Sequence, residues 1–160
     1  MKNYSNIQLL LSSIGKSLKG VLTLDMLFND ELSSSSTQEI CFEFEGELTL
    51  RLFCSADGSS ICWDSNSLQQ IDMDEYGKFA IHDANENNLW RNLIDVDLEK
   101  IYLIESNLAH SVFAVKFYFG NDFEFVIANI GDDLVFQNQL SSNVLDEEKA
   151  TFLDIATISM

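Results

Sequence analysis

The sequence predicts an α+β fold: a mainly antiparallel sheet built from two similar β-hairpin units, with N- and C-terminal helices. Two observations support this prediction. Apolar and polar residues alternate on both sides of short polar breaks, a pattern typical of antiparallel strands joined by tight turns, and the pattern recurs farther along the chain. Residues 1–160 are expected to form a single domain, because 46% of them are apolar and twelve are Phe, enough for a substantial core.

The clearest predicted hairpin lies in residues 112–136, VFAVKFYFGNDFEFVIANIGDDLVF. A three-residue loop at residues 120–122 brings six large apolar residues together on one face as three cross-strand pairs. These pairs are Phe119 with Phe123, Phe117 with Phe125, and Val115 with Ile127. A two-residue loop would shift the parity and set Phe119 against Asp122, so the pattern requires an odd loop length.

The same pattern occurs earlier in the chain. Residues 42–58, FEFEGELTLRLFCSADG, align without a gap with residues 117–133, FYFGNDFEFVIANIGDD, 75 positions later. Upstream, residues 14–25 match residues 94–105 at an offset of 80, and a serine-rich segment absorbs the difference. We interpret this as an internal duplication; two unrelated hairpins with a shared period are the alternative. The two predicted copies are residues 14–63 and 94–136.

The first copy is expected to follow a short amphipathic helix over residues 5–14, where Ile7, Leu10 and Leu11 recur at helical spacing before Gly15. Packing on the core is favoured over a membrane surface, because lysines flank this helix instead of lining one face. Residues 29–38 are polar and serine-rich, so they are predicted to form a mobile surface loop. Strands are predicted near residues 20–27, 40–45, 48–54 and 60–63.

Between the copies, residues 78–82 are expected to form a strand, and residues 84–93 a polar turn or short helix with Trp90 as its apolar anchor. After the second copy, Leu145, Phe152 and Ala156 recur at heptad spacing. This spacing predicts a closing helix capped by Asn143, and acidic residues in its first turn agree with the helix dipole.

Charge is the most unusual property of the chain. Nine Lys and Arg face twenty-six Asp and Glu, a formal net charge of −17. The first twenty residues hold three lysines and no acid, which leaves six bases against twenty-six acids, or −20, in the other 140. Binding to nucleic acid is disfavoured, because affinity for phosphates comes from neutralising them with cations. A basic protein partner is favoured; acidity that serves solubility alone is the alternative.

Short apolar runs and cysteine usage indicate the compartment. The only unbroken apolar run near the N-terminus spans residues 9–11, and no later window approaches the eighteen residues of a membrane span. We therefore expect a cytoplasmic protein without a membrane partner. Cys41, Cys54 and Cys62 are odd in number and lack CxxC spacing, so reduced thiols are expected, with Cys54 as a small buried hydrophobe.

No sequence motif supports catalysis, a metal site or a cofactor. Residues 72–83, DMDEYGKFAIHD, place acids and Gly77 as in a calcium loop, but Tyr76 occupies a ligand position. An acidic surface turn is therefore favoured there. His82 and His110 stand 28 positions apart, without metal-ligand spacing, and no nucleophile elbow or phosphate loop is present.

The binding surface is predicted mainly in the link between the copies, where acids are dense and a loop can carry function without disturbing the sheet. Tyr76 and Trp90 are candidate aromatic anchors. The alternative is a solvated loop with Trp90 buried in the core. The predicted partner-binding residues are Asp72, Asp74, Glu75, Tyr76, Asp83, Glu86, Asp122, Asp132 and Asp133.

This short, acidic chain contains two notable segments: NLIDVDLEKIYLIES (residues 92–106) and VKFYFGNDFEFVIANIGDDL (residues 115–134). With them the chain resembles the small acidic immunity proteins encoded beside bacterial polymorphic toxins, including those of contact-dependent growth inhibition systems. The missing catalytic motifs and the acidity predict a non-enzymatic binding protein. The resemblance implies that it binds a cognate toxin domain, often a nuclease, and blocks the active site or substrate path of that domain. Alternatives are a nucleic-acid-mimic inhibitor, and a small β-rich ligand-binding protein or enzyme with a deep apolar pocket.

Overall fold

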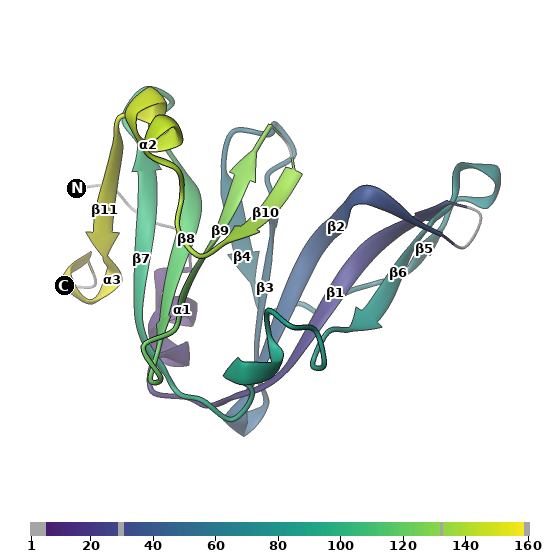
Figure 1. Cartoon of the computed structure of the whole chain (residues 1–160), viewed down its shortest axis with the longest axis horizontal. Coiled ribbons are helices and arrows are strands. Elements are labelled where there is room, and N and C mark those ends of the chain that lie inside the picture. The colour runs from purple at the N-terminus through teal and green to yellow at the C-terminus, as the bar shows by residue number, and fades with distance from the viewer. Residues whose placement is uncertain (1–5, 29–30, 132, 159–160) are drawn as a thin grey trace.

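The computed structural model describes residues 6–28, 31–131 and 133–158 (Figure 1). Its strands form two antiparallel sheets with short helical segments around them, which confirms the α+β prediction. No helix within these residues is long and apolar enough to span a membrane. The helical segments are α1 (Ile7–Ser13), η1 (Glu45–Glu47), η2 (Asp74–Tyr76), η3 (Arg91–Leu93), α2 (Ser142–Glu148) and α3 (Ile155–Ile158).

The two sheets follow each other along the chain. The six-stranded sheet has the order β4-β3-β2-β1-β6-β5, and the five-stranded sheet has the order β10-β9-β8-β7-β11. The first sheet contains β1 (Leu18–Phe28), β2 (Glu31–Phe44), β3 (Leu48–Cys54), β4 (Ile61–Asp64), β5 (Ile71–Asp72) and β6 (Lys78–Asp83). The second contains β7 (Leu98–Ser106), β8 (Ser111–Phe119), β9 (Glu124–Ile130), β10 (Asp133–Gln137) and β11 (Ala150–Asp154).

The β8–β9 hairpin has the predicted register. Phe117 pairs with Phe125, and the backbone N–H of Phe119 donates to the carbonyl oxygen of Phe123 (2.8 Å). Asp122 takes the left-handed position of the turn (φ 61°), a conformation that Asp tolerates better than most residues. The apolar alternation was therefore sufficient to define the pairing, because a one-residue slip would have turned every ring to the opposite face.

The predicted loop over residues 29–38 is wrong for most of its length. The strand β2 already begins at Glu31, which pairs with Phe28 of β1. Strand β1 pairs with Glu31 and Leu32 at one end of this stretch and with Thr37 at the other, with a register shift between them. Pairing of the flanking residues therefore outweighs the weak strand preference of serine.

The predicted closing helix forms only in part: α2 covers its first half, and the rest is not a continuation of that helix. Helix α2 is capped by Ser141, whose Oγ accepts from the backbone N–H of Val144 (3.3 Å), and Asn143 lies inside the helix. Lys149 then takes a left-handed conformation (φ 48°) that ends the helix, and β11 follows. The heptad pattern does not mark one helix, because its residues belong to three elements: Leu145 lies in α2, Phe152 in β11 and Ala156 in α3. Strand β11 pairs with the edge of β7.

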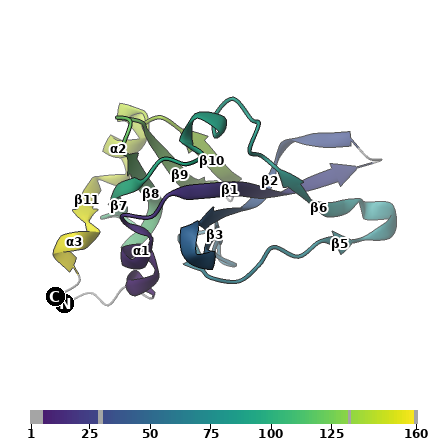
Figure 2. The same ribbon diagram turned by 90° about the horizontal axis from the view of Figure 1, so that it is seen from below.

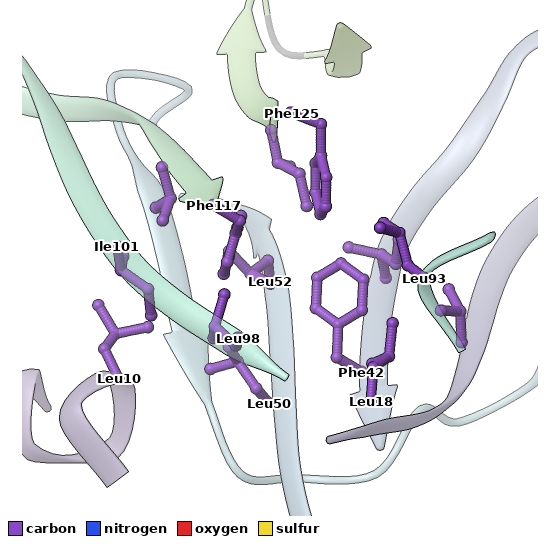
Figure 3. Close-up of a cluster of buried hydrophobic side chains, with 14 of the residues drawn as sticks. Leu10, Leu18, Phe42, Leu50, Leu52, Leu93, Leu98, Ile101, Phe117 and Phe125 are labelled. Atoms are coloured by element: carbon purple, nitrogen blue, oxygen red, sulfur yellow. The ribbon is translucent and has the colours of Figure 1, made fainter. Parts of the chain in front are cut away.

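The core lies between the facing sides of the two sheets (Figure 3). The ring of Phe42 in β2 lies 5.6 Å from that of Phe117 and 6.0 Å from that of Phe125, both in the other sheet. Trp90, just before η3, is 2% exposed, and its ring lies 5.5 Å from that of Phe42. It is thus the apolar anchor of its segment, as predicted, and Leu10 of α1 joins the same core.

The segments that lead into β1 and β7 cross in an antiparallel bridge between Ser17 and Asp97. The backbone N–H of Leu18 donates to the carbonyl oxygen of Val96 (3.0 Å). The backbone N–H of Leu98 donates to the carbonyl oxygen of Lys16 (3.0 Å). The Ser17 hydroxyl also donates to Asp97 Oδ1 (2.6 Å). Backbone hydrogen bonds therefore join the two sheets where their first strands begin.

The six-stranded sheet continues well past the second sheet (Figures 1 and 2). We call this extension the arm: residues 25–28 of β1, residues 31–37 of β2 and residues 71–80. The register joins its strands: Leu27 of β1 pairs with Lys78 of β6, whose other neighbour is Asp72 of β5. Near the base of the arm, a small apolar cluster of Leu24, Cys41 and Leu68 forms apart from the main core.

We expect Phe42→Ala to lower the free energy of unfolding by about 3–5 kcal/mol, the usual cost of removing a buried Phe ring. The reason is that Phe42 contacts aromatic rings of both sheets. Urea unfolding followed by circular dichroism measures the change. Phe28→Ala is the control: Phe28 is half exposed on the arm, so its loss should alter stability by less than about 0.5 kcal/mol. Equal effects of the two variants would contradict this description of the core.

Candidate partner-binding site

The end of the arm carries a concentrated group of exposed side chains. We call it the tip: Phe28, Ile71, Asp72, Asp74, Glu75 and Tyr76. Strand β5 and η2 place the acids and Tyr76 there, and the backbone N–H of Asp74 donates to Asp72 Oδ1 (2.9 Å). Phe28 ends β1 beside them and shares with the three acids the lining of a hollow of about 260 Å³.

Gly77 fixes the position of the tip against β1. Its backbone takes φ 95°, a conformation that L side chains rarely adopt. A Cβ at this position would collide with the carbonyl oxygen of Leu27. The carbonyl oxygen of Gly77 also accepts from the N–H of Met73 (2.8 Å), which closes the turn around η2. The close approach of backbone to backbone thus requires glycine and holds η2 beside the end of β1.

Large apolar side chains are also exposed at the tip. Among the described residues, five large apolar side chains are exposed, and three of them belong to the tip. These three are Phe28 at 52%, Ile71 at 50% and Tyr76 at 70% exposure. Exposed aromatic rings beside charged groups are typical of protein interfaces, where aromatic residues dominate the binding energy.

The predicted acidic residues do not form one cluster. Asp72 pairs with Lys78 at the start of β6, whereas Asp83 ends this strand opposite Leu22. Six extended residues span about 17–20 Å, so Asp83 and Glu86 lie far from the tip. Asp83 Oδ1 accepts from the N–H of Asn85 (2.8 Å) and so stabilises the turn after the strand. The structure brings together Asp72, Asp74, Glu75 and Tyr76 and separates the other two residues of this link.

The predicted acids of residues 122–133 lie elsewhere. Asp122 is exposed in the β8–β9 turn, and Asp133 is exposed at the start of β10, beside the opposite end of β9. Asp132 lies outside the described residues. Trp90, the second candidate aromatic anchor, is buried in the core, so only Tyr76 is available to a partner.

Sequence analysis missed a polar cluster at the base of the arm. Asp25 is only 7% exposed, and its carboxylate accepts from the hydroxyls of Thr23 (2.9 Å) and Thr37 (2.7 Å). His82 Nδ1 lies 2.8 Å from Asp25 Oδ2. The cluster joins β1, β2 and β6 by side-chain hydrogen bonds. An Asp inside the apolar strand VLTLDMLF was the only signal, since His82 stands 57 positions away.

Arg51 forms a second network across β2, β3 and β4. Its guanidinium donates through Nε to Asp64 Oδ1 (2.8 Å) and through Nη1 to Glu39 Oε1 (2.9 Å). It also lies over the ring of Phe53, 4.3 Å from the centroid. The hydrogen bond from Arg51 lowers the pKa of Asp64 below its ordinary value, and Asp64 in turn raises the pKa of Arg51. Most of the guanidinium's hydrogen-bonding capacity is thus used inside the sheet.

The residues of the calcium-loop pattern and the buried Cys41 are the candidates for metal or nucleophile chemistry that the structure places. Within the described ranges, no three His, Cys, Asp or Glu side chains are grouped to hold a metal ion. The length of β6 separates Asp83 from Asp72 and Asp74, so the residues of the calcium-loop pattern do not converge. Cys41 is buried, and burial raises the pKa of its thiol to about 11, which makes it a poor nucleophile.

Comparisons with known proteins identify no relative. No protein-family model matches the sequence, no curated protein is significantly similar to it, and no solved structure matches the fold. The feature of this structure that points to a function is the tip, an exposed group of acids and apolar side chains on a strongly acidic β-rich protein.

We expect the Arg51–Asp64 pair to contribute about 1.5–3 kcal/mol of coupling free energy at pH 7, because both groups are charged, partly buried and joined by hydrogen bonds. The folded-state pKa of Asp64 is lowered, so the contribution is complete above the ordinary value of 3.8 and is lost as the pH falls below it. A double-mutant cycle with Arg51→Met and Asp64→Asn, measured by urea unfolding between pH 7 and pH 2.5, tests both statements. Coupling that stayed constant down to pH 2.5 would argue against the pair.

Proposed function

We propose that this protein is a non-enzymatic binding protein and that the tip of the arm binds a basic protein domain. The observation that supports this most is the coincidence, at one end of one sheet, of three exposed large apolar side chains with three acids. Apolar rings supply binding energy when a partner covers them, and acids select and steer a partner of opposite charge. The net charge of −17 means that the molecule as a whole also attracts a positively charged partner.

The partner class follows from the resemblance to immunity proteins. We infer that the partner is a bacterial toxin domain, that this chain neutralises it in the cytoplasm, and that the toxin is a nuclease. A nuclease binds phosphates with basic side chains, and such a surface is complementary to an acidic inhibitor that covers the active site or the substrate path. No cofactor enters this mechanism, since covering a surface requires only complementary shape and charge.

We also propose that residues 14–63 and 94–136 are two copies of one unit. Equivalent pairs support this: Leu18 pairs with Phe44 in the first sheet, and Leu98 with Phe119 in the second, at the offsets of 80 and 75 found in the sequence. Register shifts follow Leu18 and Leu98 alike. The order of β4-β3-β2-β1-β6 also corresponds to that of β10-β9-β8-β7-β11. In this interpretation the arm is an extension of the first copy alone, which favours a role in function over a role in folding.

Growth rescue tests the proposed function. The toxin to use is the C-terminal domain of a secreted protein encoded immediately upstream of the gene for this chain. Expressed alone, that domain should stop growth; coexpression of this chain should restore growth, and the two purified proteins should form a complex in size-exclusion chromatography. Failure to restore growth and to form the complex, with both proteins folded, would refute the proposal.

The position of the binding surface requires a second test. We expect Asp72→Asn, Asp74→Asn and Glu75→Gln together to slow association with the toxin domain by about tenfold at low ionic strength. The effect should fade with added salt, because exposed charges are screened within about 10 Å at 0.1 M. Stopped-flow fluorescence measures the rate.

A matched triple variant controls for net charge. Asp83→Asn, Glu86→Gln and Asp122→Asn also remove three negative charges, but all three residues lie away from the tip. We expect this variant to associate at nearly the rate of the unaltered protein. Equal slowing by both triple variants would show that total charge, and not the tip, governs association.

A further inference from the structure

The arm has almost no share in the apolar core. No described residue of the arm belongs to the main cluster between the two sheets. Among the arm side chains whose burial the structure describes, the buried apolar ones are Leu27 and Ala80, each 9% exposed. Figures 1 and 2 show the arm extending past the second sheet, which therefore does not cover its outer part. Because burial of apolar surface is the main source of stability, the arm is less stable than the rest of the protein.

The pairing of β1 with β2 is interrupted where the arm begins. The register shifts twice, once on each side of Asp25, between Leu24 and Leu27. By contrast, the pairing of β1 with β6 runs without a shift from Leu22 to Leu27. Register shifts leave strand residues unpaired and bend the strand. One of the two ladders of β1 is therefore irregular at the base of the arm, so side-chain hydrogen bonds there carry a larger share of the attachment.

Side-chain hydrogen bonds cross the boundary between the arm and the rest of the sheet. We call the residues that form them the base cluster: Thr23, Asp25, Thr37 and His82. Asp25 and Thr37 belong to the arm, whereas Thr23 and His82 belong to the adjoining parts of β1 and β6. Asp25 Oδ2 accepts from the Thr23 hydroxyl (2.9 Å) and lies 2.8 Å from His82 Nδ1. Asp25 Oδ1 accepts from the Thr37 hydroxyl (2.7 Å), so both carboxylate oxygens are used.

We propose that the arm opens as a unit of its own: its strands unpair together while the two sheets stay folded, and the base cluster determines how rarely this happens. Local opening costs less free energy than global unfolding where few buried apolar contacts oppose it. When the arm opens, Asp25 loses its contacts with Thr23 and His82. Stronger contacts in the base cluster therefore mean a smaller population of the open arm.

Opening of the arm also takes the tip apart. Phe28 of the tip comes from β1, whereas residues 71–76 lie in β5 and η2, and β5 is joined to β1 through β6. Unpairing β6 from β1 separates these two parts. A partner that covers the tip therefore binds only the paired arm, and its apparent affinity is reduced in proportion to the fraction of molecules with a paired arm. This consequence rests on the proposed function, whereas the opening itself does not.

Native-state hydrogen exchange of the full-length protein, measured by NMR at increasing low concentrations of urea, tests the opening. We expect the hydrogen-bonded amides of residues 26–27 and 78–80 to exchange at least about a hundredfold faster than those of β8 and β9. Their exchange should also depend less on urea, because opening the arm exposes less surface than global unfolding does. Equal rates and equal urea dependence in the arm and in the second sheet would overturn the proposal.

A matched pair of variants shows which hydrogen bonds break when the arm opens. Asp25→Asn and Asp64→Asn each replace one carboxylate in a polar network of the first sheet, so both remove one negative charge. An amide has a single acceptor oxygen, so Asn at position 25 cannot serve all the partners of the carboxylate. The contacts of Asp64 lie outside the arm, in the network around Arg51.

We expect Asp25→Asn to speed exchange about tenfold, equivalent to about 1.4 kcal/mol, both in the arm and in β8 and β9, because its contacts are lost in local and in global opening alike. Asp64→Asn should speed exchange in β8 and β9 only, because its contacts survive opening of the arm. Thr37→Val keeps the side-chain shape and should act as Asp25→Asn does, by a smaller factor. Arm exchange that ignores Asp25→Asn and Thr37→Val, or that Asp64→Asn speeds equally, would overturn the role of the base cluster.

Binding of the toxin domain separates this inference from the proposed function. If the arm opens as expected but no toxin domain binds, the separate opening of the arm stands and the proposed partner is wrong. If the toxin domain binds at the tip but the arm exchanges only through global unfolding, the proposed function stands and the separate opening is wrong.

Discussion

The packing of aromatic rings between the two sheets is the contact on which the rest of the structure depends. Phe42 contacts Phe117 and Phe125 across the interface, and Trp90 closes the same cluster. Along β1 the side chains that face this interface change in character. Val21 is part of the core, and two and four residues later stand Thr23 and Asp25, both buried and hydrogen-bonded to each other. The apolar interior thus ends at a polar cluster, and the arm begins there.

The sequence predicted best where one face of a strand is buried. The register of β8 with β9 followed from alternation alone, because rings that must point inward allow one pairing. It predicted least where backbone pairing decides. The serines of β2 have little intrinsic preference for strands, and the strand includes them because Leu32 and Thr37 on either side of them pair with β1. Similarly, residues near Phe152 had helical spacing, but they form strand β11 because they pair with the edge of β7.

In the candidate site too, the residues that are close in sequence were predicted, and those brought together by strand pairing were not. Asp72, Asp74, Glu75 and Tyr76 were recognised because they are neighbours in the sequence, and a tight turn keeps neighbours together. Asp83 was assigned to the same group, but an extended strand carries it to the opposite end. Phe28 and the cluster around Asp25 were missed, since their partners are distant along the chain and only the strand pairing brings them close.

The glycine beneath the tip has a consequence for how such a protein diversifies. Gly77 allows η2 to lie close to β1, and the side chains of residues 71–76 are exposed or half-buried and do not belong to the main core. Exchanging this short turn for one of different charge or shape would leave the two sheets intact. A family built on this scaffold would therefore be able to change its recognition of partners by grafting a single turn, at little expense to folding.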